Sequence, residues 1–148
     1  MEFTLDIIKI ALLTLAFLYG VHRFNREKFR ASSHENLKAL LLVYDAINDD
    51  ESLLEIYGIK KEEITSRGLS VQQFVYLLKD FTAGQLYYDT NAEHHNGMFY
   101  KGNHRYHLCS QVTTRNAWPL LKSFFGATKY GECIEKTINF AHDNQTNT

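Results

Sequence analysis

Hydrophobic residues gather first at the beginning of the chain, where residues 3–21 read FTLDIIKIALLTLAFLYGV. With a helical rise of about 1.5 Å per residue, a helix of this length reaches roughly 28 Å, close to the thickness of the hydrocarbon core of a bilayer. Its two charged residues, Asp6 and Lys9, lie toward its beginning, where a full mid-membrane penalty does not apply. The pattern therefore predicts a transmembrane helix.

Three other interpretations compete with that prediction. A secretory signal peptide would need a basic beginning and a small-residue cleavage site, and this segment has neither. An amphipathic helix lying in the membrane interface would need a polar face, yet Thr14 is the only hydroxyl residue between Ile10 and Leu18. A buried core helix of a soluble domain stays open, because the uninterrupted apolar run is short.

Basic residues follow the apolar segment, whereas acidic residues precede it. The sequence HRFNREKFR carries four cations that we expect at the membrane surface: Arg23, Arg26, Lys28 and Arg30. By the positive-inside rule, the N-terminus lies outside and the following domain is cytoplasmic, with these cations against anionic head groups. Arg23 and Glu27 are spaced for an ion pair on a helix, so residues 1–31 are expected to form an anchor helix with a basic extension.

Apolar residues then recur with helical spacing over residues 32–142, which predicts a cytoplasmic all-α domain, a compact helical bundle. Ser32 and Glu35 have the spacing of a capping box, and indicate a new helix that ends near Asn48. Short helices are expected from Asp50 to Gly58 and from Lys60 to Gly68.

A long helix is expected over residues 71–88, capped by Ser70 and Gln73. Residues 91–103 are predicted to form a loop, and residues 104–114, 116–125 and 131–141 three further helices, with Pro119 in the first turn of the second. Residues 143–148 are predicted to be a frayed tail. No stretch alternates with period two, so a sheet is not expected.

Composition and charge narrow the class of protein. The chain has 148 residues, 45% of them hydrophobic, which suits one folded domain. The net charge of −1 gives no reason to expect binding to nucleic acid. Two cysteines, Cys109 and Cys133, are too few for a disulfide-built secreted domain, so we interpret both as reduced core thiols.

The order of elements adds a resemblance. An apolar N-terminal helix is followed by an Asp-rich turn, a Leu-Tyr-Gly helix, a long aromatic helix, Arg115-Asn116-Ala117-Trp118 and a closing helix from Tyr130 to Phe140. This order resembles small bacterial membrane-anchored all-α proteins of unknown function, although the His-rich segment departs from them. The resemblance implies an architecture and no activity.

Residues 93–109 hold the candidate chemistry. Four histidines could supply metal ligands: His94, His95, His104 and His107. His104 and His107 are three apart, so they would share a helix face, and imidazoles with the Cys109 thiol would suit a divalent metal such as zinc. The spacing matches no closed zinc motif, so solvated histidines are the competing interpretation.

Other catalytic arrangements have weaker support. Asp89 or Glu93 could act with one of these histidines in acid–base catalysis, but nothing in the sequence indicates that they converge. Cys109 and His107 are two apart and would not face each other on a helix. The aromatic residues Tyr87, Tyr88, Phe99 and Tyr100 could form a binding surface, or the rim of the core.

These patterns favour a membrane-tethered interaction module or an accessory subunit of a membrane complex, without a cofactor. Its expected partners are the lipid bilayer and another membrane protein or a second copy of itself. Two alternatives remain: a metal-binding protein that uses residues 93–109, and a soluble helical oligomer with a docking N-terminal helix.

Overall fold

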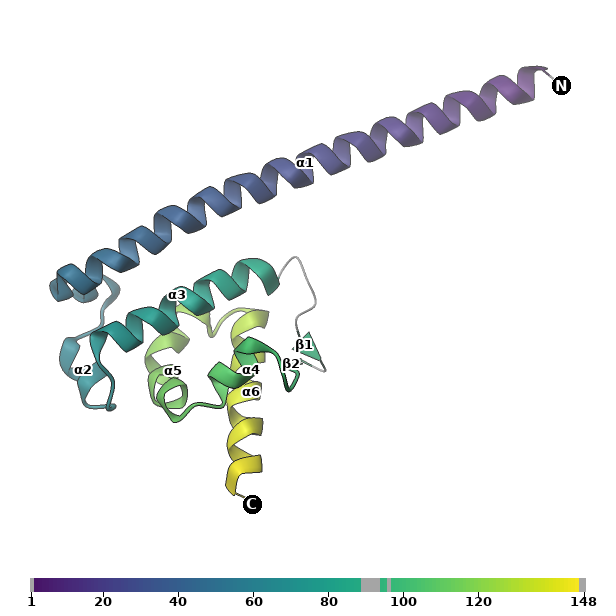
Figure 1. Cartoon of the computed structure of the whole chain (residues 1–148). Helices are drawn as coiled ribbons and strands as arrows, with labels where there is room; N and C mark the ends of the chain where they lie inside the picture. The colour runs from purple at the N-terminus through teal and green to yellow at the C-terminus, as the bar shows by residue number, and fades with distance from the viewer. Residues whose placement is uncertain (1, 89–93, 96, 147–148) are drawn as a thin grey trace. The chain divides into compact units, whose positions relative to one another are not determined.

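The computed structural model describes residues 2–88, 94–95 and 97–146, and the side chains of residues 12–88 and 97–144. It divides into two compact units, residues 1–39 and residues 40–148. Helices dominate both units, which confirms the all-α prediction. The first helix, α1 (Glu2–Asp49), is 48 residues long and passes from the first unit into the second (Figure 1).

Helix α1 corrects the prediction of a helix start at Ser32. The chain stays helical through Ser32 and Glu35, so the apparent capping box does not begin a new helix. No Gly or Pro lies between Val21 and Asp49, and so nothing interrupts the backbone hydrogen bonds of the helix. The expected pair between Arg23 and Glu27 is present, with 3.0 Å between Nε and Oε1.

The side chains of the apolar segment of α1 that the structure describes, residues 12–21, are all exposed. Leu12, Leu13, Leu15, Phe17 and Leu18 are between 57% and 71% exposed. Among the residues that the structure describes, no helix is both long and apolar enough to cross a membrane. The transmembrane prediction therefore finds no support in this part of the chain, which includes residues 12–21 of the predicted span.

Short helices connect α1 to the long helix α3. Helix η1 (Glu51–Tyr57) is a 3₁₀ helix that begins at Asp50, whose carboxylate accepts a hydrogen bond from the Ser52 N–H at 3.1 Å. It ends at Gly58, whose φ of 71° favours glycine. Helix α2 (Lys61–Thr65) follows, and Gly68 ends that turn with a φ of 76°. Both predicted short helices are confirmed.

Helix α3 (Val71–Tyr88) has the predicted bounds. Ser70 and Gln73 form the expected reciprocal cap: the Ser70 N–H donates to Gln73 Oε1 at 2.9 Å, and the Gln73 N–H donates to Ser70 Oγ at 3.1 Å. These bonds satisfy two of the free donors at the helix start. Leu77, Leu78 and Phe81 are buried as their spacing predicts.

The last third of the chain differs from prediction at several boundaries. A two-stranded antiparallel hairpin, β1 (His94–His95) with β2 (Met98–Phe99), lies where a loop was expected. Helix α4 (His104–Cys109) is shorter than predicted, and α5 (Val112–Phe125) begins four residues earlier than predicted. Pro119 consequently lies inside α5 and not in its first turn. Helix α6 (Lys129–Thr146) extends into the expected tail.

The core of the second unit forms where α3, α5 and α6 meet, with α4 and β2 packed on α6 (Figure 1). Phe81 is fully buried and its ring makes edge-to-face contacts with Trp118 and Phe125, at centroid distances of 6.4 and 6.1 Å. Tyr44 and Ile47 bury the end of α1 in the same core. Residues 40–49 of α1 therefore belong to the folded domain.

Candidate functional site: a groove between α1 and α3

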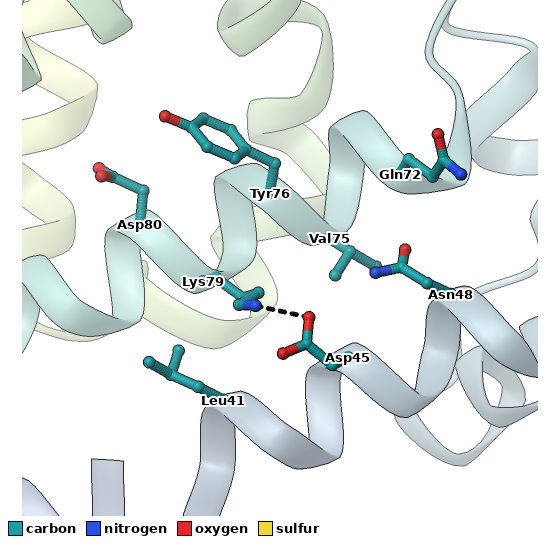
Figure 2. Close-up of a pocket in the computed structure, with 8 residues that line it drawn as sticks. All are labelled: Leu41, Asp45, Asn48, Gln72, Val75, Tyr76, Lys79 and Asp80. Atoms are coloured by element: carbon teal, nitrogen blue, oxygen red, sulfur yellow. Dashed lines mark hydrogen bonds and ion pairs between the residues drawn. The ribbon is translucent and has the colours of Figure 1, made fainter. Parts of the chain in front are cut away.

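A groove of about 550 Å³ lies between the end of α1 and the exposed side of α3. Leu41, Asp45 and Asn48 line it from α1 at positions i, i+4 and i+7, the spacing of one helix face. From α3 it is lined by Gln72, Val75, Tyr76, Lys79 and Asp80 (Figure 2). Its volume lies within the range of protein ligand sites, although it is open along its length.

The groove has an apolar floor and a polar rim. Val75 is buried and Leu41 half-buried, so their side chains form apolar surface at the bottom. Lys79 Nζ lies 2.5 Å from Asp45 Oδ1 and joins the two helices across the groove, as Figure 2 shows. Both partners are partly exposed, so we expect this pair to contribute at most about 1 kcal/mol to folding.

Tyr76 is 56% exposed and borders a second groove of about 550 Å³. That groove is shared between α3 and the junction of α4 with α5, through Leu108, Gln111 and Thr114. Gln72 and Tyr76 line both grooves. Two grooves therefore border the exposed face of α3 around Tyr76.

The predicted histidine site is only partly described. His104 and His107 both lie on α4 and are exposed. The side chains of His94 and His95 lie outside the described residues, as do Asp89 and Glu93. Among the described side chains, no group of three or more His, Cys, Asp or Glu could hold a metal ion.

The structure instead brings His104 to Asp80, a partner that the sequence analysis did not single out. His104 Nε2 lies 3.3 Å from Asp80 Oδ1, and the Asp80 side chain is 19% exposed. The second carboxylate oxygen, Oδ2, is buried and has no hydrogen-bond partner in the described structure. Asp80 therefore connects the groove to the interior of the domain.

Behind Asp80, polar side chains from three helices meet around Gly84. A Cβ atom at position 84 would overlap both the Tyr130 hydroxyl and Arg105 Nε. Tyr130 is only 1% exposed, and burial raises the pKa of its hydroxyl, an effect that the charge of Arg105 partly offsets. Only glycine at position 84 leaves space for this arrangement, so the cluster is part of the packing of α3 against α4 and α6.

The comparisons with known proteins do not show a family for the chain. No family model, no curated protein and no solved structure matches it. The resemblance to small membrane-anchored bacterial proteins therefore stays a prediction.

Both cysteines are free and buried, as predicted. Burial raises the pKa of the Cys109 thiol above its ordinary value and that of the Cys133 thiol to about 11. We expect neither thiol to react with iodoacetamide in the native protein at pH 8, and both to react once the domain is unfolded, as mass spectrometry of alkylated protein would reveal. Rapid labelling of the native chain would contradict this.

The same pKa shift has a consequence for stability. The unfolded Cys133 thiol ionises near pH 9, whereas the folded one holds its proton to about pH 11. The unfolded state thus binds fewer protons in this window, and stability falls as pH rises through it. A Cys133→Ser variant should lose less stability than wild type between these pH values.

Proposed function

We propose that this chain is a membrane-tethered interaction module, in which the first helix anchors the domain and the groove between α1 and α3 receives a partner. The observation that carries the proposal is the exposure of the apolar side chains of α1 over residues 12–21. Leu13 and Phe17 are 71% and 70% exposed, and Thr14 is the only polar residue between Ile10 and Leu18. We expect a membrane or a partner to bury this surface, because contiguous exposed apolar area marks an interaction or membrane site.

The charge of the flanking residues favours a bilayer as the surface that buries this segment. The apolar segment ends at Val21, and the next nine residues hold four of the chain's cations: Arg23, Arg26, Lys28 and Arg30. Each cation near an anionic membrane surface contributes about 1 kcal/mol to attachment. Binding to a partner protein would not in general explain why a basic segment directly follows the apolar one.

Flotation with liposomes that contain anionic lipid tests the anchor. We expect the wild-type chain to float with the liposomes and a Leu13→Asp/Phe17→Asp variant to stay behind, because each Asp costs about 3 kcal/mol in a membrane helix. Leu42→Asp/Ile56→Asp is the matched control, since Leu42 and Ile56 are 70% and 76% exposed but lie outside the segment. This control should float like wild type.

Failure of the wild-type chain to float would contradict the membrane anchor. If the wild-type chain stays in solution as an oligomer with or without liposomes, a second copy of the chain buries the exposed segment. The proposal that this segment anchors the protein in a membrane is then wrong. In that case the Asp substitutions at positions 13 and 17 would yield monomers in analytical ultracentrifugation.

A further inference from the structure

The groove between α1 and α3 has the shape of a helix-binding surface. Its two walls are helix faces that span residues 41–48 and 72–80, which at about 1.5 Å per residue is roughly two turns of helix. Side chains at i, i+4 and i+7 form a ridge along each wall, and a third helix packs by placing its own ridge between two such ridges. Val75 and Leu41 would lie under that ridge.

An extended peptide fits this groove less well. Both walls are helices whose backbone N–H and C=O groups are already paired along α1 and α3, so they offer no strand edge. The backbone of an extended peptide would leave polar groups unpaired over the apolar floor. A helical partner satisfies its own backbone and presents only side chains to the groove.

The charge near the groove indicates which charge a helical partner should carry. Lys79, the one cation among its lining residues, is paired with Asp45 at 2.5 Å. Asp80 offers little accessible charge to a partner, because its Oδ1 atom lies 3.3 Å from His104 Nε2 and its Oδ2 atom is buried. Beyond Asn48, the end of α1 continues into the exposed acids Asp49 and Asp50. The exposed charge at this end of the groove is therefore negative.

We infer that the groove binds an amphipathic helix of another protein that carries apolar residues at i, i+3 or i+4 and i+7 and is flanked by Lys or Arg. The apolar residues fill the floor over Leu41 and Val75, and the flanking cations face the acidic end of α1 at Asp49 and Asp50. This inference rests on the proposed function, since it names the partner of the same groove.

Photo-crosslinking with synthetic helices tests the inference on the full chain in mild detergent. The probe is a peptide of about four turns with a Leu face, flanking Lys residues and a photoreactive group on the apolar face. One comparison peptide replaces each Lys by Glu, and a second scrambles the order of the residues. Mass spectrometry maps the crosslinked sites.

We expect the basic amphipathic peptide to crosslink within residues 41–48 and 72–80, at least ten-fold more than either comparison peptide. Gln72→Trp, which adds an indole at an exposed lining position, should reduce that crosslinking at least ten-fold. Glu132→Trp, at an exposed position on α6 that does not line the groove, is the matched control and should behave like wild type.

Several results would overturn the inference. Equal crosslinking of the Glu peptide would show that charge does not select the partner, and equal crosslinking of the scrambled peptide would show that helix amphipathicity does not. Crosslinks between two copies of the chain at residues 41–48 or 72–80 would assign the groove to self-association. Each of these outcomes leaves the liposome flotation result untouched, so failure of the inference and failure of the membrane anchor are distinguishable.

Discussion

Replacing Phe81 by alanine is expected to lower the free energy of unfolding by about 3–5 kcal/mol, which is a large part of the stability of a domain this size. Phe81 is fully buried, and its ring contacts Trp118 and Phe125 edge to face. Alanine would leave a cavity at the meeting point of α3 and α5 and would lose both ring contacts. Urea unfolding followed by circular dichroism measures the change.

A milder variant and a surface control guard this prediction against simple misfolding. Phe81→Leu keeps most of the volume and should cost roughly 1–2 kcal/mol, so that its unfolding transition stays measurable. Tyr76→Ala removes an aromatic ring from the same helix, but that ring is 56% exposed, and surface changes usually stay within about 0.5 kcal/mol. A small loss for Phe81→Ala would mean that the core is organised differently.

Gly84→Ala is expected to destabilise the domain by about 1–3 kcal/mol, although the same change inside an ordinary helix stabilises by about 1 kcal/mol. The sign reverses because the new methyl group would overlap the Tyr130 hydroxyl and the Arg105 side chain. Gly20→Ala is the matched control, because Gly20 is also helical and has open space at its Cβ position. Thermal unfolding of both variants decides the sign.

A double-mutant cycle tests the stated cause. Tyr130→Phe removes the hydroxyl oxygen, the nearest of the atoms that a Cβ at position 84 would meet. Gly84→Ala should therefore cost less in the Tyr130→Phe background than in wild type, with a coupling of at least 0.5 kcal/mol. Additive effects would place the origin of the loss elsewhere.

Local signals account for the parts of the fold that could be predicted. Helix α3 has the predicted bounds because its Ser70 and Gln73 cap is made by residues three apart. Helix η1 ends at Gly58 and the turn after α2 ends at Gly68, where a positive φ favours glycine. Such features depend only on neighbouring residues, so the sequence displays them directly.

The errors arose where a local signal competed with the surrounding chain. Ser32 and Glu35 have capping spacing, but a cap contributes only about 1 kcal/mol and does not interrupt a helix that can continue on both sides. Pro119 indicated a helix start, yet α5 begins at Val112, and Ala117, Trp118 and Leu121 bury the turns on either side of the proline. Tertiary packing outweighs the local cost there.

The groove could not be predicted, because its walls come from residues about thirty positions apart. Asp45 and Lys79 carry no sequence motif, and only the packing of α1 on α3 brings them to 2.5 Å. The same holds for His104, which sequence spacing paired with His107 and which the fold places beside Asp80. Gly84, in the middle of an aromatic helix, was the one visible sign of a close approach at the buried cluster.

Affinity purification of the full chain from native membranes in mild detergent, with wild type and Gln72→Trp compared, tests whether the protein is membrane-tethered and binds a partner through the groove. We expect a stoichiometric partner with wild type, which is lost with Gln72→Trp and kept with the Glu132→Trp control. Recovery of the wild-type chain from the soluble fraction, or a partner that is retained equally by Gln72→Trp, would contradict a membrane-tethered module that binds through the groove.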